Sequence, residues 1–250
     1  MGPQEHDTLW TEFQTLADAI VAFGQESNLP YIAAASDIGD PHPLRDKDGN
    51  ILAETTFKWL DPTLEYWKDP AFALRSGFIM AVRHCSEPFY FADGDFKSWR
   101  RNFALEAINS EAEFDTYGVS TAIICPCYSP RGVVGAVVWA SDDPDVDVAG
   151  VFETSAADLH ALALKFLSIY RDARAGAQAA HLVDLTRREI VCLKWAAAGK
   201  TDAEIATIIG VSQPTVRFHL TNAFRKLGVS GRSQAVRLAT NLGYIGGASS

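Results

Sequence analysis

The C-terminal part of the chain combines apolar residues at helical spacing with residues that start helices. Thr186 with Glu189 and Thr201 with Glu204 each form a Thr-x-x-Glu box. In such a box the hydroxyl and the carboxylate satisfy backbone N–H groups that a helix start leaves without partners. Apolar residues follow each box at steps of three and four, and a glycine closes each segment. This pattern predicts two short helices separated by a tight turn.

Two more helices are expected downstream of these boxes. Ser212 can cap a third helix, and Pro214 falls in its first turn, where the missing N–H costs nothing. A fourth helix is expected over about 233–242. Two short helices joined by a glycine-containing turn are typical of a helix-turn-helix.

At 100° per residue, the third helix separates an apolar stripe from a mixed polar face. The stripe consists of Val216, Leu220, Ala223, Phe224 and Leu227. The opposite face carries Phe218, Thr221 and Arg225, flanked by Arg217 and Asn222. Arginine can read guanine with two hydrogen bonds, and an exposed phenylalanine can contact a thymine methyl group. An ordinary solvated face is the alternative interpretation, and the aromatic residue argues against it.

The N-terminal part has the pattern of helices flanking a mostly antiparallel sheet. We expect helices over about 9–23, from Phe96 towards Phe114 with an end at Gly118, and over 152–174. We expect strands over 31–35, 51–57, 121–127 and 133–141, the last two joined by a hairpin turn at 129–132. The strand at 133–141 is apolar without alternation, which suits a central strand. The fold class is therefore an α/β sensor domain plus an all-α four-helix helix-turn-helix domain.

Three segments follow from these patterns: residues 1–174, a linker at 175–184, and residues 185–250. The charge differs sharply between the two ends. Residues 181–250 carry nine Lys and Arg against four Asp and Glu, a net charge of +5, whereas the other 180 residues have a net charge of −14. Basic charge supplies the sequence-independent part of DNA affinity, so only the C-terminal part is expected to approach DNA.

Composition narrows the class of protein. No apolar run reaches membrane-spanning length, and the N-terminus lacks the features of a secretory signal, so no membrane association and a cytoplasmic location are expected. The four cysteines lack zinc-site spacing, and no metal or cofactor is expected. Cys125 and Cys127 are predicted to share one strand face as buried thiols, with a redox switch as the alternative. Cys125 and His160 could be assembled into a catalytic pair, but no catalytic motif surrounds them, so the chain is not expected to be an enzyme.

The helix expected over 152–174 permits two interpretations. Its apolar residues alternate in steps of four and three: Phe152, Ala156, Leu159, Ala163, Phe166 and Tyr170. This spacing suits either a dimer interface or packing on the domain's own sheet. A homodimer is expected in either case, because one helix-turn-helix usually reads half of a two-fold symmetric operator.

The C-terminal motif resembles the LuxR-type DNA-binding domain. The resemblance is carried by Leu185–Glu189, Gly199–Thr201, Glu204–Ala206, Val211–Ser212, Thr215–Val216, His219–Leu220, Asn222, Lys226–Leu227 and Gln234–Val236. It implies base contacts by Arg217, Phe218 and Thr221, although some family members have Lys or Arg at the position of Thr221. It also implies that Lys200, Thr215, His219 and Lys226 support the helix or touch phosphates. Asn222 and Arg225 complete the candidate DNA interface, and RNA polymerase is a further candidate partner.

The N-terminal domain shares fewer landmarks with the acyl-homoserine lactone-binding domain of quorum-sensing LuxR-type regulators. Asp69-Pro70 resembles the family's Asp-Pro, which implies a carboxylate that accepts the ligand's amide N–H. A helix cap is the alternative role for Asp69. Trp59 and Tyr66 are candidates for an aromatic pair of the ligand pocket, with Trp67 as an alternative to Tyr66.

Two positions depart from the family pattern. Phe91 stands where the family has tryptophan, and phenylalanine cannot donate a hydrogen bond. Val138 falls on a strand position where hydroxyl side chains often hold the polar head of the ligand. The expected function is a ligand-responsive transcriptional regulator of quorum-sensing type, whose signal is an acyl-homoserine lactone or a related, more apolar molecule. The alternatives are a regulator without a small ligand, controlled by a protein partner, and an N-terminal enzymatic domain fused to a DNA-binding domain.

Overall fold

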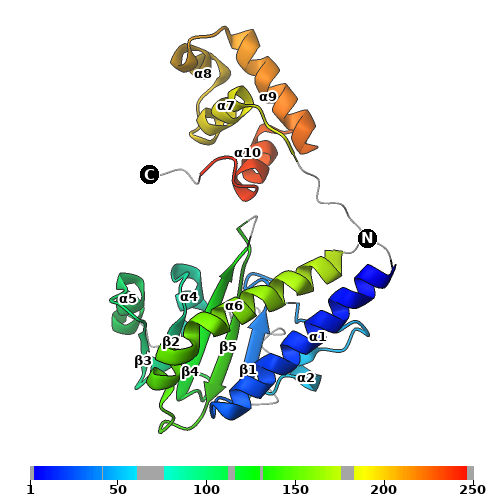
Figure 1. The fold of residues 1–250 in the computed structure, drawn as a ribbon. Helices are drawn as coiled ribbons and strands as arrows, with labels where there is room; N and C mark the ends of the chain where they lie inside the picture. The colour runs from blue at the N-terminus through cyan, green and yellow to red at the C-terminus, as the bar shows by residue number, and fades with distance from the viewer. Residues whose placement is uncertain are drawn as a thin grey trace. The chain divides into compact units, whose positions relative to one another are not determined.

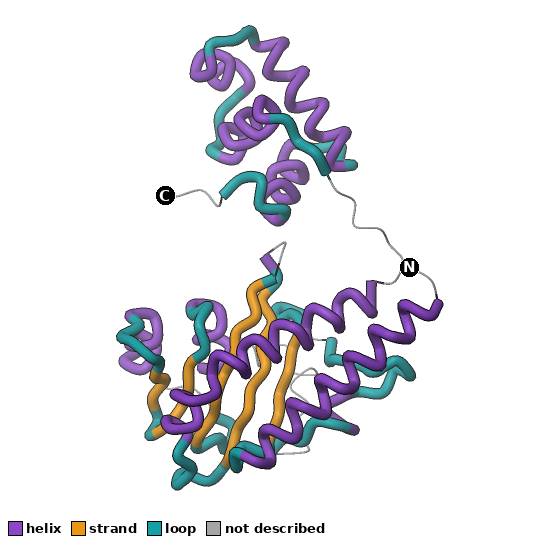
Figure 2. The backbone as a smooth tube through the Cα atoms, in the orientation of Figure 1, coloured by secondary structure: helices purple, strands orange, loops and turns teal. Residues whose placement is uncertain are grey.

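The structure is a computed structural model that describes residues 3–40, 42–60, 76–111, 116–129, 132–175 and 183–246. The chain divides into two compact units: Met1–Ser129 with Val133–Gln178 forms the first, and Ala179–Ser250 belongs to the second. The first unit is an antiparallel sheet with helices and the second is entirely helical (Figures 1 and 2). The predicted fold class is confirmed.

The sheet of the first unit has five strands in the order β1-β5-β4-β2-β3, and every neighbouring pair is antiparallel. The strands are β1 (Tyr31–Ala35), β2 (Phe89–Ala92), β3 (Asp95–Lys97), β4 (Thr121–Tyr128) and β5 (Val134–Ser141). β4 and β5 pair along their whole length, with Ile124 opposite Val138. The apolar, non-alternating β5 lies between β1 and β4, so its predicted central position is confirmed.

Two long helices cover one face of this sheet. α1 (Pro3–Glu26) and α6 (Val148–Ala175) lie side by side across it (Figure 1). Their contact includes stacked rings of Phe13 and Phe166, whose centroids are 4.8 Å apart. The four-and-three stripe of α6 is buried within this layer, so it packs on the unit's own core. Gly135 of β5 allows the close approach, because a Cβ there would lie 2.8 Å from Leu167 of α6.

The other face of the sheet carries a second apolar cluster. It is covered by α4 (Gly77–His84) and α5 (Phe103–Glu111) near the β2–β3 edge (Figure 1). Phe89 and Phe91 point into it from β2, whereas the intervening Tyr90 packs against the α1–α6 face. We call this group the second-face cluster; its buried members are Phe78, Ala81, Val82, Cys85, Phe89, Phe91, Phe96, Leu105, Val119, Ala122, Ile124, Ala136 and Ala140.

The strand predicted over 51–57 is wrong. The segment forms a one-turn helix, α2 (Leu52–Thr55), and Phe57 follows it; Leu52 and Phe57 are buried, and Glu54 and Thr55 are exposed. The Phe57 N–H donates to the Leu52 carbonyl at 2.7 Å, so the chain turns back after α2 and can bury both side chains, whereas an alternating strand would send them to opposite faces.

The helix predicted from Phe96 is also wrong at its start. Phe96 lies in β3, where it pairs with Phe91, and α5 begins only at Phe103. The Asn102 side chain accepts from the backbone N–H of Ala104 at 3.0 Å, so it acts as the cap. Asn109 exchanges two 2.9 Å hydrogen bonds with the Phe96 backbone and ties α5 to β3. The helical spacing of the aromatic residues was therefore coincidental.

The predicted helices of the second unit are confirmed within one or two residues. They are α7 (Arg187–Ala197), α8 (Asp202–Ile209), α9 (Gln213–Leu227) and α10 (Arg232–Asn241). Their shared core is formed by buried residues of all four helices together with Leu185 and Ile245. The linker predicted over 175–184 lies largely outside the described residues.

Candidate nucleic-acid interface

Two helix caps and one turn glycine set the geometry of α8 and α9. Thr201 and Glu204 form the predicted capping box of α8, with the Thr201 N–H donating to the Glu204 carboxylate at 2.8 Å. Gly210 ends α8 in the left-handed region, with φ of 68°, which a residue with a Cβ adopts at a cost. Ser212 then caps α9 by accepting from the Thr215 N–H at 3.3 Å. The two helices are thus joined by a turn with the chemistry of a helix-turn-helix.

The inner side of α9 is anchored in the core of the unit. Val216, Leu220, Ala223 and Leu227 are buried, and the partly buried Phe224 packs beside them. The predicted apolar stripe is confirmed. Because this stripe packs into the core, the residues on the opposite side of α9 face away from the core.

The base-reading residues that the resemblance implied all lie on the outer side of α9. Arg217, Phe218 and Thr221 are exposed, with 72% of the Arg217 side chain and 62% of Phe218 accessible. A phenylalanine with most of its surface in water makes no contribution to the core. Arg225 is also exposed and donates to the Asn222 carboxamide oxygen at 3.2 Å. The outer side of α9 therefore offers cationic, aromatic and hydroxyl groups together.

Supporting residues surround this outer side. Thr215 is within 2.8 Å of the Ser212 hydroxyl, and the half-exposed Lys200 pairs with Glu204 at 3.4 Å. His219 is partly buried beside Phe218, with ring centroids 5.7 Å apart. Thr215 thus reinforces the start of α9, whereas Lys200 is half exposed and pairs with Glu204 in the first turn of α8.

Lys226 has a structural partner that the sequence did not indicate. Its ammonium lies 2.9 Å from the carboxylate of Glu189, which is almost completely buried. Burial alone would raise the pKa of the Glu189 carboxyl, but hydrogen bonds from Lys226 and from the Thr186 N–H outweigh it and hold the pKa below its ordinary value. The pair joins the start of α7 to the end of α9. Lys226 therefore anchors the end of α9 to the start of α7.

Asp202 is a second residue that sequence reasoning missed. It lies in the first turn of α8, where its Oδ1 accepts from Arg232 of α10 at 2.7 Å. Its Oδ2 is 3.7 Å from Nε of Arg217. No local pattern links residues 30 positions apart, so only the folded unit reveals this contact.

The predicted sensing residues fall into two groups. Trp59, Phe91 and Val138 all belong to or pack against the second-face cluster, although they are far apart in sequence. Phe91 is buried between the rings of Phe78 and Phe96, at 5.3 and 5.2 Å. Tyr66 and Asp69 lie outside the described residues.

A buried indole N–H lies beside the second-face cluster. Among the described residues, Trp59 Nε1 is buried and has no hydrogen-bond acceptor. A buried donor is costly unless an acceptor satisfies it. The same tryptophan packs against a surface that is otherwise apolar. An apolar surface beside one hydrogen-bond donor suits a mostly apolar ligand with one polar group.

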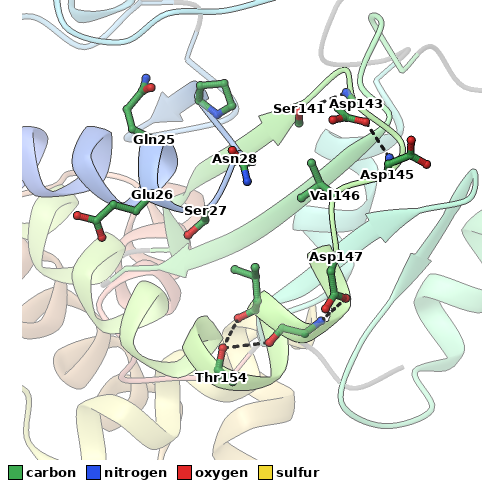
Figure 3. A pocket seen from close by; sticks show the side chains of 13 residues that line it. Gln25, Glu26, Ser27, Asn28, Ser141, Asp143, Asp145, Val146, Asp147 and Thr154 are labelled. Atoms are coloured by element: carbon green, nitrogen blue, oxygen red, sulfur yellow. Dashed lines mark hydrogen bonds between the residues drawn. The ribbon is translucent and has the colours of Figure 1, made fainter.

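A hollow of about 710 Å³ lies elsewhere, where α1 ends and α6 begins (Figure 3). Its walls carry the acidic side chains of Glu26, Asp143, Asp145 and Asp147. Asp143 and Asp147 accept backbone N–H groups of their own loops, at 2.9 and 3.0 Å, so they have structural partners. Neither Trp59 nor the β2 aromatics line it. Trp59, Phe91 and Val138, the predicted sensing residues that the structure describes, are therefore not part of this hollow.

The predicted character of Cys125 and Cys127 is confirmed. Both thiols are free and buried in the α1–α6 face. Burial raises the pKa of Cys125 well above its ordinary value and that of Cys127 to about 12. A thiol held in the protonated form is a poor nucleophile, which disfavours Cys125 as a catalytic group. Within the described ranges, no cluster of His, Cys, Asp and Glu could hold a metal, and no helix is long and apolar enough to cross a membrane.

Comparisons with known proteins agree with this geometry. Residues 183–239 match the model of the family described as bacterial regulatory proteins, luxR family. The chain is 37% identical over 134 residues to the transcriptional activator protein VanR of Vibrio anguillarum, covering 51% of this chain and 53% of VanR. It is 39% identical over 119 residues to the quorum sensing-dependent transcriptional regulator VjbR of Brucella ovis, covering 47% of this chain and 44% of VjbR.

The chain thus spans about half the length of these relatives. A crystal structure of Escherichia coli SdiA shares its fold, with a TM-score of 0.50 and 17% identity over 96% of this chain and 98% of SdiA. The family match covers α7, α8, α9 and most of α10, and it therefore includes the outer side of α9. The C-terminal unit of this chain is a helix-turn-helix domain of the luxR family of bacterial regulatory proteins.

Proposed function

We propose that the chain is a sequence-specific DNA-binding transcriptional regulator that inserts α9 into the major groove. The observation that carries this proposal is the exposure of Arg217, Phe218 and Thr221 on the outer side of α9 in a luxR-family domain. The N-terminal half of a recognition helix contacts base edges; Arg217 and Phe218 lie in that half, and Thr221 lies one turn further along on the same side. Lys200, whose side chain is half exposed, acts on phosphates rather than on bases.

Selection of duplexes from a random pool by the full-length protein tests this proposal. We expect an enriched sequence with two-fold symmetry, because a homodimer presents two copies of α9 to two half-sites. Footprinting should then protect two half-sites separated by about one helical turn. Enrichment of no sequence over the starting pool would refute sequence-specific binding.

We further propose that the first unit binds a small signal molecule at the second-face cluster. Phe91 belongs to this cluster, Trp59 and Val138 pack against it, and the indole N–H of Trp59 has no acceptor among the described residues. The signal would be an acyl-homoserine lactone or a related apolar molecule with a carbonyl oxygen that accepts from Trp59. Asp69 would receive the amide N–H of such a ligand. The name of the relative VjbR, quorum sensing-dependent, supports this class.

Mass spectrometry of small molecules that co-purify with the intact protein identifies the ligand. A lactone or another acyl compound in stoichiometric amount would support the sensing role. Thermal shifts with a series of acyl-homoserine lactones provide a second measurement, because a ligand that binds only the folded state raises its stability. An absence of both co-purified ligand and thermal shift would favour the alternative, a regulator controlled by a protein partner.

The same proposal covers the setting in which the protein acts. A homodimer that binds an operator in the cytoplasm would regulate transcription through contact with RNA polymerase. Ligand can change DNA affinity only if it binds the DNA-competent dimer and the incompetent state with different affinities. Analytical ultracentrifugation with and without ligand tests the dimer, and one monomeric species at all concentrations would contradict it.

A further inference from the structure

The carboxylate of Asp202 is fixed between two helices. Its Oδ1 accepts from Arg232 Nη1 at 2.7 Å, and Arg232 also donates to the carbonyl oxygen of Lys200. Arg232 belongs to α10, so α10 determines where the Asp202 side chain at the start of α8 lies. Only 20% of that side chain is exposed. Because one oxygen is committed to Arg232, the other has a defined direction.

That second oxygen faces the recognition helix. Asp202 Oδ2 lies 3.7 Å from Nε of Arg217, whose side chain remains 72% exposed. The contact is long, and it leaves the rest of the guanidinium in water. Asp202 therefore offsets part of the positive charge of Arg217 and favours a conformation in which the Arg217 side chain points towards Asp202, while the guanidinium stays exposed. This differs from Lys226, which is held by the buried Glu189.

We propose that Asp202 is a specificity-determining residue for DNA binding: it holds Arg217 back from indiscriminate phosphate contacts. This inference rests on the proposed DNA-binding function. Specificity is the difference between two affinities, and an element that opposes the wrong complex raises it. On a random duplex, Arg217 can gain one phosphate contact only if it moves away from the carboxylate of Asp202, which Arg232 holds in place. On the operator, Arg217 can form a bidentate contact with guanine through its other guanidinium N–H groups while Nε stays beside Asp202.

The perturbation that isolates this role is Asp202→Asn. Asparagine keeps an oxygen that can accept from Arg232, so the link between α8 and α10 is retained while the negative charge is lost. We expect the variant to bind a random-sequence duplex of about 30 base pairs, roughly three helical turns, more tightly than the wild type. One additional phosphate contact steepens the plot of log affinity against log salt by about 0.9. The random duplex should gain roughly three- to tenfold in affinity at low salt, and the operator less than twofold, since Arg217 keeps its contact with Asp202 when it binds the operator.

Fluorescence anisotropy with full-length protein measures both affinities across a salt series. The operator is a duplex selected by the wild-type chain from a random pool. Asp184→Asn is the matched control, because it removes an exposed acid from the same unit without touching Arg217. In the Arg217→Ala background, Asp202→Asn should lose its effect on the random duplex. A merely structural role for Asp202 would not depend on residue 217.

Each outcome has a defined meaning. A gain with Asp202→Asn that disappears in the Arg217→Ala background supports the inference. A gain equal to that of Asp184→Asn, or one that persists without Arg217, overturns it. If Asp202→Asn unfolds, Asp202→Ser provides a second neutral acceptor for the same comparison. If the wild type binds neither duplex, the proposed DNA-binding function itself fails, whereas wild-type binding without an Asp202 effect refutes only this inference.

Discussion

The buried carboxylate of Glu189 gives the sharpest stability prediction. Glu189→Ala removes a 2.7 Å bond from the Thr186 N–H and a 2.9 Å pair with Lys226. Hydrogen bonds to charged groups contribute about 1.5–3 kcal/mol each. The Lys226 side chain is about one third exposed, so its ammonium can regain water in the variant, and loss of the pair costs less than loss of a fully buried one. We expect the free energy of unfolding of the C-terminal unit to fall by about 3 kcal/mol, which lowers its midpoint temperature by roughly 10–20 °C.

Hydrogen exchange measured by mass spectrometry on the full-length protein tests this prediction. Peptides from α7 and α9 report on the C-terminal unit separately from the sheet of the first unit. Glu204→Ala is the matched control, because Glu204 occupies the same place in a capping box but is half exposed, and the lysine that pairs with it, Lys200, is more distant at 3.4 Å. Equal loss of protection in the two variants would show that the buried contact with Lys226 contributes nothing beyond the cap.

The same residue predicts a pH dependence. The folded state lowers the pKa of Glu189 below its ordinary value of 4.5, so its contribution to stability is present above about that pH. The contribution is lost as the pH falls through the lowered folded pKa. The difference in stability between wild type and Glu189→Gln should therefore be largest near neutrality and shrink in acid. A difference that stays constant from pH 7 to 3 would contradict the proposed ionic role.

Three further predictions concern the site and its scaffold. Arg217→Ala should reduce operator affinity more than random-duplex affinity in a gel-shift titration. The control Arg237→Ala, at an exposed residue of α10, should change neither affinity. Equal losses on both duplexes would exclude base reading by Arg217. Asp69→Ala should abolish the response to ligand in an operator-binding assay and leave ligand-independent DNA binding intact; an unchanged response would identify Asp69 as a helix cap. Gly210→Ala should lower the melting temperature of the C-terminal unit, because a residue with a Cβ would have to adopt a φ of 68°, at a cost of about 1 kcal/mol. An unaltered melting curve would show that the turn relaxes without strain.

The second unit was largely predictable because its signals are local. Capping boxes, a glycine in the left-handed region and the period of 3.6 residues act within a few positions of one another. They defined α7, α8, α9 and α10 almost to the residue, and the stripe of α9 identified its outer side. The first unit was less predictable, since its aromatic residues suit either a helix or a strand. Phe96 entered β3 because Phe91 and Asn109 were available to pair with it, and both choices depend on the sheet.

The sequence by itself determined the helix-turn-helix, the exposed side of α9 and the separation of a basic from an acidic segment. The tertiary structure alone decided the partners of charged residues. It assigned Lys226 to Glu189 across 37 positions and Asp202 to Arg232 across 30. It also brought Trp59, Phe91 and Val138 to one face of the sheet. The reason is physical: caps and helical periods are set by neighbours along the chain, whereas a long charged side chain finds whichever opposite charge the packing of helices brings within reach.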